Sequence, residues 1–194
     1  MSEALLFDQP IHFLKIDVEG FELPALESAS RLYEKGLVEN TVLEFGPPSR
    51  WDVTIEQREG MTPEQIRATT VKQAKTIMKR VVGEWDLDIY LLPAAGWDRT
   101  VAWMLEHQVD YSQDDPTKNK VVHRLKAWDF DGAAPEGDEF EAELNAKNQL
   151  VTEYIPLPPN LIDSYLDSLE TIGEMYFWLV KRDSKNAIMQ KFEL

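Results

Sequence analysis

The sequence contains no cysteine and only three histidines. The lack of cysteine excludes disulfide bonds, thiolate metal ligands and a cysteine nucleophile. His12, His107 and His123 are far apart, and no two of them have the spacing of zinc ligands. A histidine-based metal site is therefore not expected, and the sequence predicts no metal.

Long apolar runs are also missing. No stretch approaches the roughly 20 apolar residues that a membrane-spanning helix requires. The first ten residues, MSEALLFDQP, have no basic region and only a short apolar run, so they do not form a signal peptide. By default we expect a cytoplasmic chain with no membrane segment.

Positive charge is scarce, because 20 lysines and arginines stand against 35 acidic residues, a net charge of −15. An acidic surface repels the phosphates of nucleic acids, so no nucleic-acid partner is expected. The simplest interpretation of the acidity is solubility. A length of 194 residues is enough for one domain with a real core, and residues 1–194 are expected to form it.

Four common site motifs are absent: a Walker loop, a GxSxG elbow, an HExxH pair and a GxGxxG turn. The last is the usual phosphate cradle of nucleotide-binding α/β folds. The sequence therefore offers no recognisable glycine-rich cofactor loop.

The most informative stretch runs from Ile11 to Gly20, IHFLKIDVEG. Its short apolar run predicts a strand of a parallel sheet, buried on both faces. Directly at its carboxyl end come Asp17, Glu19, Gly20 and Glu22. Ligands of open α/β sheets bind outside this end of the strands, so these residues are site candidates.

The following segment completes a strand–helix–strand unit. Apolar residues from Leu23 to Leu37 recur at helical spacing, and Gly36 is placed to end the helix. Residues 40–45 then predict a second buried strand. If the two strands are parallel neighbours, Glu44 lies at the same sheet edge as Asp17 and Glu19.

Thr62, Pro63 and Gln65 predict a capped start for a helix over residues 63–82. One face of this helix is basic. It is either a docking face for an anionic partner or for the protein's own acidic segments, or simply a solvated surface, and solvation is the preferred interpretation.

Residues 86–92 predict a third strand and a second strand–helix–strand unit. Residues 93–159 have weak periodicity and are interpreted as an insertion or irregular region, with a helix after Val101. Residues 155–159 predict a stiff connector, and Asn160 the cap of a short helix that ends at Gly173. A last strand is expected over 175–180, followed by a frayed tail.

The segment LKIDVEGFE, Leu14–Glu22, closely resembles the signature of the FkbM family of S-adenosylmethionine-dependent methyltransferases. Leu26 and the strand VLEF, residues 42–45, extend the resemblance. It implies an α/β fold with a partial Rossmann-like class I methyltransferase sheet, mostly parallel with its last strand antiparallel. The family's glycine-rich loop lies upstream of the motif. The chain is therefore expected to lack the N-terminal cofactor-binding strands and to be either the C-terminal part of a longer protein or the product of a gene model that begins too late.

From this resemblance we expect O-methyl transfer from S-adenosylmethionine to a hydroxyl of a small molecule or sugar. Asp17 and Glu19 are the catalytic candidates, and Asp17 and Gly20 the cofactor-binding candidates. Glu22 and Glu44 are the substrate candidates, although Glu22 is better explained by the helix N-terminus. Because side chains alternate along a strand, Asp17 and Glu19 are expected on opposite faces.

Two other hypotheses stay open. One is a non-catalytic interaction module that retains half of the methyltransferase fold and acts through the basic helix or the acidic insertion. The other is a divalent-metal site formed by Asp17, Glu19 and Glu44 at the strand ends. Separately, the exposed, apolar edge of the first strand is expected to promote self-association.

Overall fold

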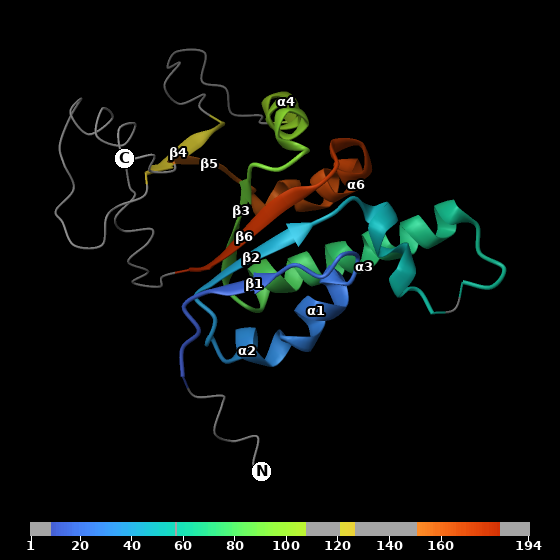
Figure 1. Cartoon of the computed structure of the whole chain (residues 1–194), viewed down its shortest axis with the longest axis horizontal. Helices are drawn as coiled ribbons and strands as arrows, with labels where there is room; N and C mark the ends of the chain where they lie inside the picture. Colours follow the sequence, from blue (N-terminus) through green and yellow to red (C-terminus); the bar gives the residue numbers. More distant parts are fainter. Residues whose placement is uncertain (1–8, 57, 108–120, 127–150, 183–194) are drawn as a thin grey trace, which may run out of the picture.

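The computed structural model describes residues 9–56, 58–107, 121–126 and 151–182, which form a six-stranded sheet with helices (Figure 1). The strand order across the sheet is β1-β2-β6-β3-β5-β4. The strands are β1 (Leu14–Ile16), β2 (Asn40–Phe45), β3 (Leu87–Leu92), β4 (His123–Lys126), β5 (Val151–Pro156) and β6 (Met175–Lys181).

The sheet is mixed. Among the strands that the structure describes, only β1 and β2 pair in parallel, whereas β6 lies antiparallel between β2 and β3, and β5 and β4 add two more antiparallel pairings. The α/β class and the antiparallel last strand are confirmed. The prediction of a mostly parallel sheet is wrong, because β6 separates β2 from β3, which run in the same direction.

The helices are α1 (Glu22–Ser28), α2 (Ser30–Glu34), α3 (Pro63–Gly83), α4 (Trp97–His107) and α6 (Ile162–Ile172), with 3₁₀ turns η2 (Pro48–Thr54) and η3 (Pro159–Leu161). The main core joins helices and sheet: Met78 of α3, Leu43 of β2 and Phe177 of β6 are fully buried in it. Their neighbours on the opposite sheet face, Val42 and Trp178, belong to a separate, smaller cluster. In the part of the chain that the structure describes, no helix has the length and apolarity to cross a membrane.

Local signals predicted several boundaries well. The strand over residues 40–45 is confirmed, and Thr62 and Gln65 form the predicted reciprocal cap of α3. Gly36 and Gly173 follow helices with φ of +62° and +97°, values that suit glycine.

Four local predictions need correction. The strand predicted from Ile11 is only three residues long, and it is not buried on both faces, since Ile16 is 6 % exposed but Phe13 is 56 % exposed. β1 has a partner strand on one side only among the described residues, which explains the exposure. The helix after it is divided at Ala29 into α1 and α2.

The second pair of corrections concerns the chain before α6. The predicted connector is partly strand, because Ile155 and Pro156 belong to β5. Asn160 does not cap α6, since Pro159 begins a 3₁₀ turn and Leu161 becomes the capping residue without a side-chain bond. Within 93–159, α4, β4 and β5 are described, whereas residues 108–120 and 127–150 of the predicted irregular region, and residues 183–194 with the predicted tail, lie outside the described residues.

Candidate functional site at the sheet edge

Three carboxylates meet where β1 and β2 end. Asp17 follows β1, Glu19 lies in the next turn, and Glu44 is near the end of β2; one oxygen of each lies within 4.8 Å of the others. Glu44 is therefore at the edge that the sequence predicted. Asp17 and Glu19 are not separated onto opposite faces as expected, because β1 already ends at Ile16 and Glu19 adopts a positive φ of 37°.

Arg50 is the cation at the centre of this group. Its guanidinium forms ion pairs with Glu44 at 3.0 Å, with Glu19 at 3.3 Å and with Glu174. We call Asp17, Glu19, Glu44 and Glu174, together with Arg50, the acid cluster. Arg50 is positioned by η2, whose buried Trp51 packs on Phe45 with ring centroids 4.6 Å apart.

The start of β6 contributes to the same edge because β6 runs antiparallel to β2. The Tyr176 hydroxyl donates to Oε2 of Glu44 at 3.5 Å, and Glu174 precedes the strand. Burial raises the pKa of Glu44, and the hydrogen bond from Arg50 partly opposes this rise. Burial also raises the pKa of Tyr176, and the charge of Glu44 adds to the effect.

The carboxylates differ in their access to solvent. The side chains of Asp17 and Glu19 are 40 % and 74 % exposed, whereas that of Glu44 is 13 % exposed. Asp17 pairs with Lys15 at 2.9 Å, and this hydrogen bond raises the pKa of Lys15. A ligand at this edge would therefore meet Asp17 and Glu19 first and find Glu44 behind them.

Gly20 and Glu22 shape the turn after β1. Gly20 has φ of +89°, and a Cβ built there would lie 2.5 Å from the backbone oxygen of Arg50. Its N–H donates to Oε1 of Glu22 at 2.9 Å, and Glu22 is fully buried at the start of α1. The backbone at Gly20 therefore packs closely against η2. The buried Glu22 carboxyl stabilises the turn by accepting the hydrogen bond from the Gly20 N–H. The predicted cofactor role of Gly20 and substrate role of Glu22 stay predictions.

Sequence reasoning missed Lys15, Arg50, Glu174 and Tyr176 as members of this edge. An antiparallel last strand was expected, and its start must lie beside the carboxyl ends of the parallel strands. That signal could have found Glu174 and Tyr176. Arg50 follows two prolines in a loop, and nothing in its local pattern distinguishes it from a surface arginine.

The basic face of α3 contacts the protein's own acidic residues. Arg67, Lys75 and Lys79 pair with Glu170, Asp167 and Asp163 of α6, which we call the α3–α6 ladder. Arg80 pairs with Glu27 of α1, Glu34 of α2 and Glu84. Of the interpretations left open, docking to the protein's own acidic segments is the one that the structure shows.

Comparison with known proteins supports the resemblance found in the sequence. The family described as methyltransferase FkbM domain matches residues 3–81, a stretch that contains β1, β2 and most of α3. No curated protein and no solved structure gives a significant match to the chain.

Proposed function

We propose, from the premise that residues 3–81 belong to the methyltransferase FkbM family, that the edge formed by β1, β2 and β6 carries O-methyl transfer. The methyl donor is S-adenosylmethionine, and the acceptor is a hydroxyl of a small molecule or sugar. The observation that carries the proposal is the meeting of Asp17, Glu19 and Glu44 within 4.8 Å at the carboxyl ends of the parallel strands.

The carboxylates at this edge fit the cofactor chemically. S-adenosylmethionine carries a sulfonium and an ammonium cation together with ribose hydroxyls, and when bound it supplies an electrophilic methyl group. Carboxylates attract cations and accept hydrogen bonds from hydroxyls. Asp17 and Glu19 would hold it, because both are exposed at the edge.

The chain's own residues then orient the acceptor and take its proton. Glu44, held by Arg50 and Tyr176, accepts a hydrogen bond from the acceptor and fixes its position. The Asp17 carboxylate would accept the proton that the acceptor hydroxyl loses when its oxygen takes the methyl group. Arg50 keeps the carboxylates together and limits their mutual repulsion.

Two measurements test this proposal. Although the N-terminal cofactor-binding strands are expected to be missing, the proposal requires the 194-residue chain to bind S-adenosylmethionine or its demethylated product, and titration calorimetry should show this binding in the micromolar range. We also expect Asp17→Asn to abolish transfer of labelled methyl to a panel of sugars and small hydroxyl compounds while the circular dichroism spectrum is retained. The matched control is Asp167→Asn, which removes an exposed carboxylate of the α3–α6 ladder and should leave transfer unchanged.

The outcomes separate the parts of the proposal. Wild-type turnover in Asp17→Asn would remove Asp17 from the chemistry, and the absence of cofactor binding would contradict an enzymatic role for this chain.

A second candidate function, a self-associating interaction module, is favoured by β1, which is a terminal strand of the described sheet beside the 56 % exposed Phe13. A constant monomer mass in concentration-dependent light scattering would contradict it.

A further inference from the structure

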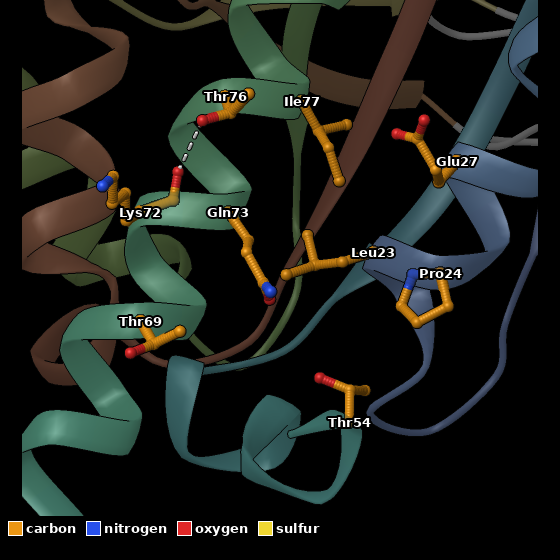
Figure 2. Close-up of a pocket in the computed structure, with 9 residues that line it drawn as sticks. All are labelled: Leu23, Pro24, Glu27, Thr54, Thr69, Lys72, Gln73, Thr76 and Ile77. Carbon is orange, nitrogen blue, oxygen red and sulfur yellow. Dashed lines mark hydrogen bonds between the residues drawn. The ribbon is translucent and has the colours of Figure 1, made fainter. Parts of the chain in front are cut away.

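A separate pocket lies on the helical side of the molecule, between α1, the end of η2 and α3 (Figure 2). Its volume is about 520 Å³, within the range of small-molecule sites. Its walls are formed by Leu23, Pro24, Glu27, Thr54, Thr69, Lys72, Gln73, Thr76 and Ile77. None of these residues belongs to the acid cluster.

The pocket has an apolar floor where two helices meet. Leu23 of α1 is 2 % exposed and Ile77 of α3 is 7 % exposed, and Pro24 adds a further apolar surface. Figure 2 shows the side chain of Gln73 reaching from α3 toward Leu23. A ligand in this pocket would therefore contact hydrocarbon below and one amide group at the side.

The hydroxyl hydrogens of the three threonines in the wall are already donated to backbone oxygens. Thr54 donates to the backbone oxygen of Trp51 at 2.7 Å. Thr69 and Thr76 donate to the backbone oxygens of Gln65 and Lys72 at 2.9 and 3.0 Å. Side-chain donors for a ligand are thus limited to Gln73 and Lys72.

The charges around the pocket are not balanced. Both oxygens of Glu27 accept from Nη1 of Arg80 at 2.8 Å, and Arg80 also pairs with Glu34 and Glu84. Four cations of α3 have ion-pair partners, but Lys72 pairs with none of the residues that the structure describes. Lys72 therefore supplies one uncompensated ammonium group at the rim of the pocket, and Figure 2 shows its side chain pointing away from Gln73, so a change of rotamer is needed for it to reach a ligand.

We propose that this pocket binds a small amphipathic anion, a monocarboxylate with an aromatic or aliphatic body. The body lies on Leu23 and Ile77, the Gln73 amide donates to the carboxylate, and the Lys72 ammonium, at the end of a long flexible side chain, pairs with it. The volume suits one such molecule and excludes a folded partner. This site is additional to the function proposed for the sheet edge and does not depend on it.

The test uses 2-naphthoate and its neutral counterpart 2-naphthamide, titrated into the full chain and followed by naphthalene fluorescence. At low salt we expect naphthoate to bind several-fold more tightly than naphthamide, because only the carboxylate pairs with Lys72. Lys72→Gln should reduce naphthoate to the affinity of naphthamide, and Lys72→Arg should retain the preference. Gln73→Trp should fill the pocket and abolish binding of both.

Lys79→Gln is the matched control, since it removes an α3 cation that already pairs with Asp163 and does not line the pocket. It should leave both affinities unchanged. The proposal is overturned if naphthoate shows no saturable binding, if the two probes bind equally, or if Lys79→Gln weakens naphthoate as much as Lys72→Gln. Binding that survives in a Gln73→Trp variant with a native circular dichroism spectrum would overturn it equally.

Discussion

The acid cluster and the α3–α6 ladder are both built from charged side chains of different elements, but the acid cluster has fewer cations for its carboxylates. In the ladder, each of Arg67, Lys75 and Lys79 has a carboxylate of its own on α6, and Arg67 also pairs with Asp52 of η2. In the acid cluster, Arg50 alone serves three carboxylates, and Asp17 relies on Lys15. Two cations therefore face four carboxylates at the sheet edge.

This difference separates a structural arrangement from a candidate site. Exposed pairs such as Lys79–Asp163 contribute at most about 1 kcal/mol each, and they link α6 to α3. Holding Glu44 at 13 % side-chain exposure beside other acids is unfavourable, because burial and like charges both disfavour its ionised form. An arrangement that opposes folding in this way is typical of sites that bind or transform a ligand.

The largest expected effect comes from the turn that shapes the acid cluster. Gly20→Ala places a Cβ 2.5 Å from the backbone oxygen of Arg50, at a φ of +89°. Strain and overpacking together should lower the free energy of unfolding by about 2–4 kcal/mol. Urea denaturation followed by tryptophan fluorescence measures this loss.

Two other glycines serve as controls. Gly60 also has a positive φ, +81°, but a Cβ there meets nothing within 4 Å, so Gly60→Ala isolates the backbone strain. Gly83, at the end of α3, is equally open and has no positive φ, so Gly83→Ala should stabilise the chain by about 0.5 kcal/mol. If Gly20→Ala and Gly60→Ala lower the free energy of unfolding equally, the contact between the added Cβ at position 20 and Arg50 contributes nothing to the loss.

The next effect comes from the central cation. Arg50→Met leaves Glu44 and Glu174 without their shared partner, and their side chains are only 13 % and 26 % exposed. Leaving such groups unpaired should lower the free energy of unfolding by about 1–3 kcal/mol. The same urea experiment measures it.

Arg80→Met is the matched comparison, since Arg80 also serves three carboxylates. These partners, Glu27, Glu34 and Glu84, are 50 % exposed or more and return to water when the arginine is removed. The loss should therefore be clearly smaller than for Arg50→Met. Equal losses would show that burial does not distinguish the acid cluster from the exposed ion pairs.

The fold could be predicted from the sequence wherever one local signal dominated. β2 is a short apolar run bounded by a turn, and α3 has a capping box at its start, so both were placed correctly. β1 has the same apolar composition as a central strand, and composition says nothing about which strands lie beside it. The exposure of Phe13 and the position of β6 between β2 and β3 depend on long-range pairing that no local pattern contains.

The candidate site could likewise be predicted only where a local signal was present. Asp17, Glu19 and Glu44 follow strands, so their meeting at one edge follows from parallel pairing of β1 and β2. Arg50 and Glu174 are 124 residues apart, and only the folded chain brings them together. The burial of Glu22 is a further result of packing, since its carboxyl folds back beneath Gly20.

The smallest expected effect is a pH dependence of stability that Glu44 causes. Burial raises the pKa of Glu44 above its ordinary value of 4.5, so the folded protein binds this proton more tightly than the unfolded chain. The stability contributed by the protonated group is full below pH 4.5 and is lost as pH rises through the folded pKa. In Glu44→Gln this loss is absent. Urea titrations should therefore show the free energy of unfolding of the variant rising relative to that of the wild type between pH 4.5 and the folded pKa of Glu44.

Arg50→Met sharpens the same measurement. Because the hydrogen bond from Arg50 lowers the pKa of Glu44, its removal should raise that pKa further and widen the pH window over which stability is lost. The double variant with Glu44→Gln should not show the wider window, which assigns the effect to Glu44 rather than to another carboxylate of the acid cluster. Stability curves of the wild type and Glu44→Gln that run parallel from below pH 4.5 to neutral pH would contradict the argument, since they would show that Glu44 ionises alike in the folded and unfolded chains.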